Sequence, residues 1–358
     1  MAVLRYRTAL VAAVFVLLMS QRCARCSDLF GLCVTPYWPD VPNHGVCYTE
    51  EMAADIGRLG ARWMRCEFIC ARQGHMDLVG WDEIMARARR HGLRVIGLLD
   101  YSTLQGPAAS DWATPEYAER FAARAAFVAN RYKNQVSVWE IWNEPNLPDF
   151  RLDPEPYANL LALTYRAIKA VDHRAVVCAA GLAGCWSGEN NLQAKQYLEE
   201  LCESAACRAF KAERGFYPFD AVANHPYAWE KPASRYLETG LKDNVLSVMR
   251  KYGDGAKPIY ITEIGWDADP DSPTRMGPDR EENERRQAEW IAELYEITPR
   301  MKRQDGSPLV TTVCIHCYQA PGGFGLREFG SDRKRPAYDA YRRAARGSGA
   351  SNDEDCQE

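Results

Sequence analysis

The sequence predicts an α/β fold, a (β/α)8 TIM barrel built as a single domain. Short runs rich in apolar and β-branched residues alternate with longer stretches of helical periodicity, and this alternation repeats eight times along the 358 residues. Each short run is almost continuously apolar, as expected of parallel strands that are buried on both faces. A minimal barrel of this kind needs roughly 250 residues. We therefore expect the remaining length to lie in loops.

The candidate strands and helices follow one another in strict alternation. The strands are predicted at residues 29–37, 61–68, 93–101, 136–142, 175–181, 219–225, 258–263 and 309–318. Between them lie helical stretches, among them residues 81–91, 115–132, 156–171, 191–210, 234–252 and 280–297. Several helices begin with proline or acidic residues and end near glycine, asparagine or a basic residue, which are ordinary helix boundaries.

The two ends of the chain differ in character from the barrel segment, residues 27–346. Arg5 and Arg7 precede an apolar run over residues 9–19, and small and polar residues follow it. This pattern is typical of a secretory signal peptide, which we place at residues 1–26. We therefore expect a secreted, extracellular protein with no stable membrane span after cleavage; an uncleaved anchor is the alternative. The polar, acidic segment 347–358 is expected to be disordered.

Charge and cysteine content narrow the classes of partner and cofactor. The formal net charge is −4 and no dense run of lysine and arginine occurs, which argues against nucleic acid as a partner. Thirteen cysteines in a secreted chain favour disulfides. The pairs 33/47, 66/70, 178/185, 202/207 and 314/317 are close in sequence, but spacing leaves the connectivity open. Cys314-x-x-Cys317 has no second ligand pair, so we expect no metal and no other cofactor.

Two short motifs carry the candidate chemistry. Trp142-Asn143-Glu144-Pro145 lies at the end of the fourth predicted strand, and Thr-Glu263-Ile-Gly-Trp lies at the end of the seventh. In a barrel, the carboxyl ends of the strands are where active sites are built. Ionised carboxylates are rarely buried without a partner or a function, which makes both glutamates candidate catalytic groups. Glu140, earlier on the fourth strand, is a rival acid, and strand alternation does not choose between the two.

Together, in this order and on these strands, the two motifs resemble those of clan A glycoside hydrolases, most closely families 39 and 5. The resemblance covers the chain through all eight predicted strands. It implies that Glu144 is the acid/base, that Glu263 is the nucleophile and that Asn143 binds the sugar 2-hydroxyl. It further implies an enzyme that hydrolyses O-glycosyl bonds with retention of configuration.

Further positions on the second and sixth predicted strands match the clan's pattern. Arg65 is placed to keep Glu263 ionised, and the Tyr227 hydroxyl is placed to donate a hydrogen bond to the same carboxylate. His225 is expected to line the −1 subsite, the position of the sugar ring that reacts. A core histidine bonded to the backbone is the alternative for His225.

The chain departs from the clan's pattern at two strand ends. Many members carry a histidine after strand three and a tryptophan after strand eight, where this chain has Asp100-Tyr101-Ser102 and Cys314-Ile-His316-Cys-Tyr318. The usual sugar platform is therefore missing. The candidates for stacking on sugar rings are Tyr37, Trp38, Trp186, Trp229, Trp266 and Tyr318.

The resemblance and charge together predict a double displacement. Two carboxyl groups about 5–5.5 Å apart do not ionise together easily, so we expect Glu263 to be ionised beside Arg65 and Glu144 to keep its proton. A transglycosylase with the same pair and a catalytically silent glycan-binding barrel are the alternative functions. The sequence leaves open which β-linked glycan is the substrate, whether the action is exo or endo, and the oligomeric state.

Overall fold

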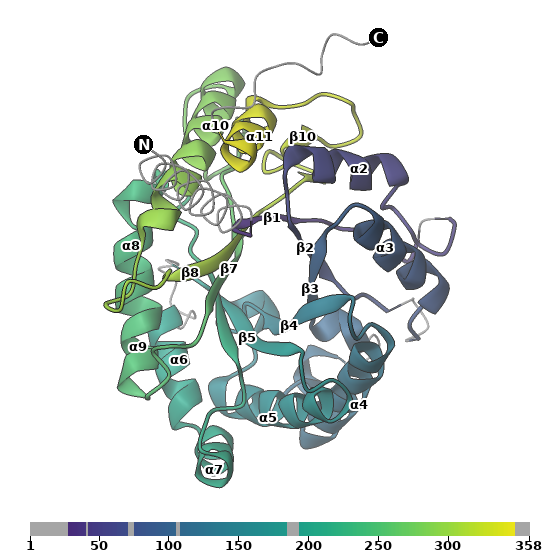
Figure 1. The fold of residues 1–358 in the computed structure, drawn as a ribbon, viewed down its shortest axis with the longest axis vertical. Coiled ribbons are helices and arrows are strands. Elements are labelled where there is room, and N and C mark those ends of the chain that lie inside the picture. Colours follow the sequence, from purple (N-terminus) through teal and green to yellow (C-terminus); the bar gives the residue numbers. More distant parts are fainter. Residues whose placement is uncertain (1–27, 41, 71–74, 105–107, 185–192, 348–358) are drawn as a thin grey trace, which may run out of the picture.

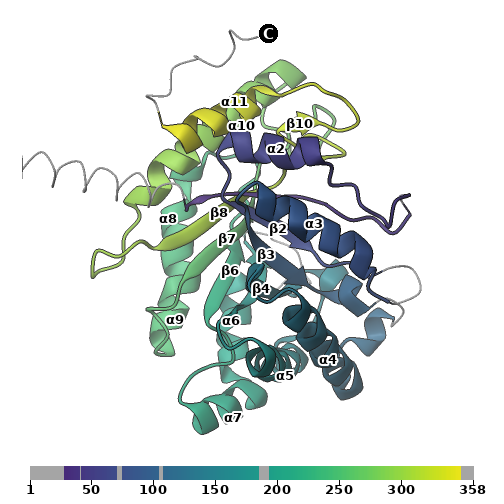
Figure 2. The same ribbon diagram turned by 45° about the vertical axis from the view of Figure 1, so that its right-hand side comes forward.

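The computed structural model describes residues 28–40, 42–70, 75–104, 108–184 and 193–347, and within them it contains a closed barrel of eight parallel strands with helices outside (Figures 1 and 2). The predicted TIM barrel is confirmed. The strands are β1 (Phe30–Cys33), β2 (Trp63–Glu67), β3 (Arg94–Leu99), β4 (Val136–Asn143), β5 (Val176–Ala183), β6 (Ala221–His225), β7 (Ile259–Ile264) and β8 (Val310–Ile315).

Each strand pairs with the next one in the chain, and β1 pairs with β8 to close the ring, with Leu32 opposite Ile315. Every predicted strand overlaps an observed one. The largest errors lie at the strand ends: β1 is shorter than predicted, whereas β4, β5 and β7 continue beyond their predicted ends. The extra residues matter, because they bring Asn143 into β4 next to the candidate acid.

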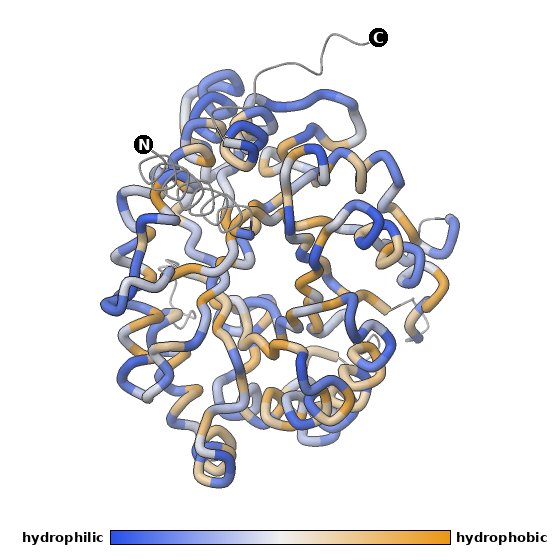
Figure 3. Tube along the Cα trace, viewed as in Figure 1, coloured by the Kyte–Doolittle hydropathy of each residue, from blue (hydrophilic) through white to orange (hydrophobic). Residues whose placement is uncertain are grey.

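The α-helices of the described residues surround the strands. They are α2 (Glu50–Leu59), α3 (Leu78–Arg90), α4 (Pro115–Arg131), α5 (Pro154–Val171), α6 (Ala194–Glu203), α7 (Ala205–Arg214), α8 (Leu237–Gly240), α9 (Ser247–Lys251), α10 (Arg280–Ile297) and α11 (Pro336–Arg346). Figure 3 shows the apolar residues gathered on the strands and on the inner sides of these helices.

Two predicted helices are broken into shorter ones. The helix predicted at residues 191–210 is interrupted at Ser204, whose hydroxyl accepts a hydrogen bond from the Cys207 amide and so starts a new helix. The helix predicted at residues 234–252 is divided into α8, a π-helical turn over Leu241–Leu246 and α9. Gly240, a poor helix former, lies at the first of these junctions.

A buried carboxylate ties the first part of the ring to the last. Asp55 of α2 is 5% exposed and accepts hydrogen bonds from the hydroxyls of Tyr318, after β8, and Tyr338, on α11, at 2.8 and 2.7 Å. Arg327 approaches the same carboxylate at 3.5 Å. Asp55 therefore joins α2 to the chain that follows β8.

The expected disulfides, whose connectivity the sequence left open, are not confirmed. The thiols of Cys33, Cys47, Cys66, Cys178, Cys202, Cys207, Cys314 and Cys317 are free in the structure. Most of these thiols are buried in the packed core, and Cys33 Sγ lies 3.2 Å from the Thr262 carbonyl oxygen, to which it donates. Cys185, the predicted signal peptide and nearly all of the predicted C-terminal tail lie outside the described residues. No helix within the described ranges is both long and apolar enough to cross a bilayer.

Replacing Asp55 is expected to weaken the closure of the ring. In Asp55→Ala the two buried tyrosine hydroxyls lose their acceptor, and an unsatisfied buried polar group costs about 1–3 kcal/mol. We expect the free energy of unfolding, measured with urea, to fall by about 2–5 kcal/mol. Glu119→Ala, on the exposed side of α4, is the control. A loss of less than about 1 kcal/mol would show that this contact is not important to closure.

Candidate active site

The backbone at the end of β4 separates the two glutamates of the first motif. Trp142 and Glu144 have φ values of 74° and 44°, in the left-handed region that non-glycine residues rarely adopt. Each such residue costs of order 1–3 kcal/mol, and such strain concentrates at functional sites. Glu140 is completely buried in the barrel, whereas the Glu144 side chain is 12% exposed. The two carboxylates therefore lie in different environments, which simple strand alternation does not reveal.

Arg65 of β2 lies at the centre of the site. Its guanidinium donates to Glu140, with Nε 2.6 Å from Oε2 and Nη2 3.2 Å from Oε1. Nη2 also donates to Asn143 Oδ1 at 3.0 Å, and Nη1 donates to Glu263 Oε1. One buried cation thus links β2, β4 and β7.

Glu140 is a permanent carboxylate. Besides Arg65, it accepts hydrogen bonds from the Thr262 hydroxyl at 2.9 Å and the Gly181 amide at 3.1 Å. Burial alone raises the pKa of Glu140, but the Arg65 charge and hydrogen bonds from His225 and Arg65 outweigh it and lower the pKa to about 2. A side chain with this pKa and no exposed surface is unsuited to donate a proton to a substrate.

Glu263 is also held as a carboxylate, but it reaches the cleft, because its side chain is 15% exposed. The Tyr227 hydroxyl donates to Glu263 Oε2 at 3.0 Å, and Arg65 donates to Oε1. Burial opposes ionisation, but the charges of His225 and Arg65 hold the pKa of Glu263 well below its usual range. The structure contains both contacts that were predicted for this carboxylate.

Glu144 is paired with His225 rather than with an arginine. Glu144 Oε1 lies 2.9 Å from His225 Nδ1, and His225 Nε2 lies 2.9 Å from the Thr262 hydroxyl. Because that hydroxyl gives its proton to Glu140, it accepts from Nε2, which therefore carries a hydrogen. Nδ1 is left to share a proton with Glu144.

His225 does not line an open subsite, because its side chain is completely buried. Burial lowers the pKa of His225, but the Glu263 charge and hydrogen bonds with Glu140 and Glu144 raise it to about 9. The predicted position of His225 in the −1 subsite is therefore wrong. The backbone-bonded alternative is also wrong, because its partners are the Glu144 and Thr262 side chains. Gly181 provides the space for the ring, because a Cβ there would lie 2.1 Å from His225 Nε2.

Glu144, His225 and Glu263 form a compact cluster. One oxygen of each carboxylate and one ring nitrogen lie within 4.8 Å of one another. These three side chains are placed closely enough to hold a metal ion. A divalent cation there would compete with the proton between Glu144 and His225 and would be repelled by the nearby Arg65 guanidinium. The donor set is better suited to moving a proton.

Three of the six predicted aromatic subsite residues are not accessible. Tyr37, Trp266 and Tyr318 are at most 1% exposed: Tyr37 stacks on Trp81, and the Tyr318 hydroxyl is bonded to Asp55. Their predicted role in stacking on sugars is corrected, because these rings are buried against residues of the surrounding helices α2, α3 and α10. Trp186 lies outside the described residues.

Two of the aromatic candidates keep exposed surface. Trp38 is 51% exposed, and Trp229 is partly exposed and stacks on Tyr227 with ring centroids 4.8 Å apart. Phe324, which the sequence did not single out, lies 6.1 Å from the Trp229 ring. At the strand-eight position of the usual tryptophan, His316 Nδ1 lies 4.0 Å from Glu263 Oε2.

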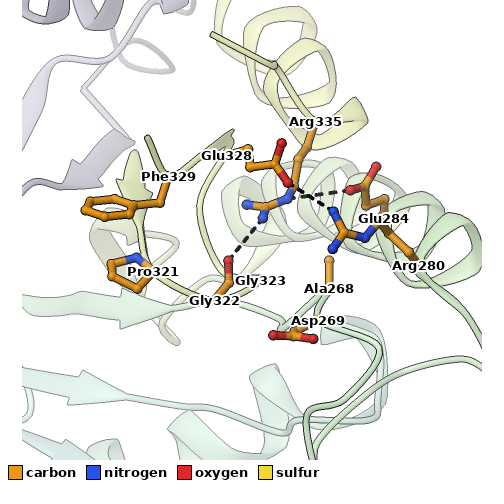
Figure 4. A pocket seen from close by; sticks show the side chains of 10 residues that line it. All are labelled: Ala268, Asp269, Arg280, Glu284, Pro321, Gly322, Gly323, Glu328, Phe329 and Arg335. Atoms are coloured by element: carbon orange, nitrogen blue, oxygen red, sulfur yellow. Dashed lines mark hydrogen bonds and ion pairs between the residues drawn. The ribbon is translucent and has the colours of Figure 1, made fainter. Parts of the chain in front are cut away.

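A separate cavity of about 340 Å³ lies between the loops that follow β7 and β8 (Figure 4). Arg280 pairs with Glu328 at 3.0 Å, and Arg335 lies 3.6 Å from Glu284 and donates to the Gly322 carbonyl. The charges in this cavity are thus largely paired with one another. The lining residues are Ala268, Asp269, Arg280, Glu284, Pro321, Gly322, Gly323, Glu328, Phe329 and Arg335, none of which was a predicted site residue.

Sequence reasoning missed two groups at the site. Thr262, next to Glu263 in the second motif, orients His225. Glu67 lies two residues beyond Arg65 on β2, and alternation along a strand places both on the same side. The two-residue spacing from Arg65 could have identified Glu67 in the sequence as a residue on the same side of the strand.

Comparisons with solved structures show the same fold. The family 39 glycoside hydrolase from Bacteroides cellulosilyticus WH2 has a TM-score of 0.59 at 18% identity, over 90% of this chain and 64% of that one. The family 1 β-glucosidase from Thermotoga maritima has a TM-score of 0.62 at 15% identity, over 89% and 98%. The monomeric β-xylosidase from Caulobacter crescentus CB15 has a TM-score of 0.57 at 20% identity, over 88% and 67%.

Sequence comparison adds nothing to this likeness: no family model matches the chain, and the search of curated proteins found no match. The chain spans less than two thirds of the family 39 structure. At these identities the likeness establishes the architecture. The eight-stranded barrel of this chain is the fold shared with these solved structures.

The ion pair between Glu140 and Arg65 is expected to stabilise the fold in a pH-dependent way. The pKa of Glu140 is lowered from 4.5 to about 2. The contribution of the pair to the free energy of unfolding is therefore present above pH 4.5 and is lost as the pH falls through about 2. Glu140→Gln leaves Arg65 without its closest charge partner. Breaking a buried ion pair costs about 3–5 kcal/mol, and we expect a loss of that size in urea unfolding at pH 7.

The same variant should lose less stability than the wild type on acidification. A variant as stable as the wild type at pH 7 would contradict the role of Glu140 as the counter-ion of Arg65. Glu289→Gln, an exposed carboxylate of α10, is the matched control.

Proposed function

We propose that the protein is a retaining β-glycosidase that hydrolyses O-glycosidic bonds of a β-linked oligo- or polysaccharide. One observation carries the proposal: Glu144 and Glu263 present oxygens within 4.8 Å of each other, and only Glu263 is bound by a guanidinium. Retaining glycosidases use two carboxyl groups about 5–5.5 Å apart, one as nucleophile and one as acid/base. The likeness to glycosidase barrels supports the proposal through the fold.

The first step forms a covalent intermediate. The Glu263 carboxylate, held by Arg65 and Tyr227, attacks the anomeric carbon. Glu144 transfers its proton to the glycosidic oxygen, which leaves with the aglycone. The sugar is then joined to Glu263 by an ester bond, with its configuration inverted.

The second step releases the sugar. Glu144, now a carboxylate, takes a proton from a water molecule that attacks the anomeric carbon from the side the aglycone left. The ester bond to Glu263 breaks, and the second inversion gives net retention. The contact of Glu144 Oε1 with His225 Nδ1 at 2.9 Å orients the carboxyl group that gives up a proton in the first step and regains one from water in the second.

Asn143 is prepared for substrate by its contact with Arg65. Its side-chain oxygen is already used as an acceptor, so its NH2 group remains the available donor, and the side chain is partly exposed. A donor beside the reacting centre suits the 2-hydroxyl of the sugar, whose hydrogen bonds strengthen in the transition state.

We also propose that the protein is secreted. The basis is the segment at residues 1–26, with Arg5 and Arg7 before an apolar run. Export agrees with a polymeric glycan as substrate. Mass spectrometry of the protein recovered from the medium gives the amino terminus, and cleavage between residues 19 and 28 is expected.

Chemical rescue assigns the two glutamates. We expect Glu263→Ala and Glu144→Ala each to lose activity on an aryl β-glycoside by a factor of about 10⁴ or more, because each removes a group that acts in the transition state. Azide should restore Glu263→Ala and give the α-glycosyl azide, whereas Glu144→Ala should give the β-glycosyl azide. Glu289→Gln serves as the exposed control.

Nuclear magnetic resonance of the first product formed by the wild type gives an independent check. A product of inverted configuration would contradict the proposed double displacement.

The pH dependence of kcat/KM is expected to be bell-shaped. The acidic limb follows Glu263, whose pKa is held below its usual range by His225 and Arg65 despite burial, so activity persists below about pH 4. The basic limb follows His225: burial lowers its pKa, but the Glu263 charge and hydrogen bonds with Glu140 and Glu144 raise the pKa of His225 to about 9, so activity falls as the pH rises toward that value. A flat profile over this range would contradict the assigned roles.

A further inference from the structure

The cavity between the loops that follow β7 and β8 lies on the same face of the barrel as Glu263, and the steps above do not use it (Figure 4). The carboxyl ends of parallel barrel strands share one face, so both loops begin at that face. Gly323 lines the cavity, and the next residue, Phe324, has its ring centroid 6.2 Å from that of Tyr227. The Tyr227 hydroxyl donates to Glu263. The cavity is therefore one residue along the chain from a ring that neighbours the proposed catalytic groups.

One wall of the cavity is apolar and open to solvent. Phe329 is 60% exposed, more than any other large apolar residue of the part of the chain that the structure describes. Pro321, which is also exposed, lies on the same side of the cavity in Figure 4. Apolar surface exposed in a cavity of about 340 Å³ is typical of a ligand-binding site. We therefore interpret the Phe329 ring as the apolar platform of such a site.

The rest of the cavity is polar, and ion pairs hold its side chains in place. Arg280, the first residue of α10, donates to Glu328 at 3.0 Å. Glu284, one turn further along α10, accepts hydrogen bonds from Arg333 at 2.8 and 2.6 Å and lies 3.6 Å from Arg335. Glu284 and Arg335 are each 5% exposed, whereas the Arg280 and Glu328 side chains are 56% and 31% exposed. The outer ion pair therefore keeps donors and acceptors that a bound molecule can reach.

The charge of the lining does not favour an ionic ligand. The lining has three carboxyl and two guanidinium side chains, those of Asp269, Glu284, Glu328, Arg280 and Arg335. The excess of carboxyls argues against an anion, and the pairing of Glu284 and Glu328 with arginines argues against a metal ion. A neutral ligand with an apolar face and several hydroxyls fits both walls. A sugar ring has this form, because its C–H groups lie on its faces and its hydroxyls extend from its edge.

On the basis of the proposed glycosidase function, we propose that this cavity is a second sugar-binding site, which holds one ring of a long β-glycan chain away from the bond that is cleaved. The ring stacks on Phe329 and places its hydroxyls against Arg280 and Glu328, because hydrogen bonds to charged groups are stronger than neutral ones. A volume of about 340 Å³ is at the lower end of the range for small-ligand sites, which suits a single ring. A chain held at both sites binds more tightly than one held at the catalytic site alone, because its second contact is intramolecular.

Binding at the second site is measured without catalysis. Glu263→Ala and the double variant Glu263→Ala/Phe329→Ala are compared by affinity electrophoresis in gels that contain barley β-glucan, laminarin or xylan. We expect at least one polymer to retard Glu263→Ala, and the additional Phe329→Ala change to weaken that binding by about 5- to 10-fold. Equal retardation of the two proteins, or no retardation by any of these polymers, would overturn the second site.

A kinetic comparison separates the second site from the catalytic one. For the polymer that binds, Phe329→Ala alone should raise KM by a similar factor and leave kcat unchanged. For 4-nitrophenyl β-D-glucoside or β-D-xyloside, both constants should equal those of the wild type, because so small a substrate occupies only the catalytic site. A KM raised equally for polymer and aryl glycoside would contradict the proposal, since Phe329 would then act within the catalytic site.

Two further variants complete the comparison. Phe127→Ala removes a phenylalanine of α4 that is 49% exposed and does not line the cavity, so it should change neither binding nor kinetics. Glu328→Gln weakens the ion pair with Arg280 and should weaken polymer binding by a smaller factor than Phe329→Ala. This second lining variant keeps the test available if Phe329→Ala does not fold.

The outcomes distinguish this inference from the function on which it rests. No turnover of any aryl β-glycoside or β-glycan by the wild type would overturn the proposed function. The gels would still show whether Phe329 contributes to binding a glycan, because retardation requires no catalysis.

Discussion

The pairing of the Arg65 guanidinium with Glu140 and Glu263 is the interaction on which the rest of the site depends. A buried cation needs its charge and its donors satisfied. Glu140 accepts from the Arg65 guanidinium inside the barrel. The guanidinium still has N–H groups that donate to Glu263 and to the Asn143 side-chain oxygen. The same guanidinium therefore keeps Glu263, the proposed nucleophile, ionised and leaves the NH2 end of the Asn143 amide available as a donor.

Glu140 and Glu144 have different partners because of the backbone conformation at the end of β4. If β4 kept its regular pleat, Glu140 and Glu144 would lie on the same side and compete for Arg65. The left-handed conformations at Trp142 and Glu144 end this regularity, and they place Glu144 against His225 instead. One carboxylate becomes a counter-ion and the other keeps a partner with which it shares a proton. The strain of that backbone is the kind found at functional sites.

The residues around Glu144 and Glu263 include no tryptophan at the end of strand eight. The tryptophan platform usual after strand eight is absent, and the tyrosine that follows β8 instead anchors α2 through Asp55. Near Glu263, Asn143 offers a donor, because its side-chain oxygen already accepts from Arg65.

The sequence by itself determined the barrel, its strands and the two glutamates, because buried parallel strands are recognised by continuous apolar runs and strand ends place their next residues at one face. It also indicated that Arg65 and Tyr227 meet Glu263. Only the tertiary structure decided that Glu140 is a counter-ion, that His225 is buried against Glu144 and that three of the candidate aromatic rings are buried. These outcomes depend on contacts across the barrel between strands distant in the chain, and local periodicity carries no information about which side chains fill that shared interior.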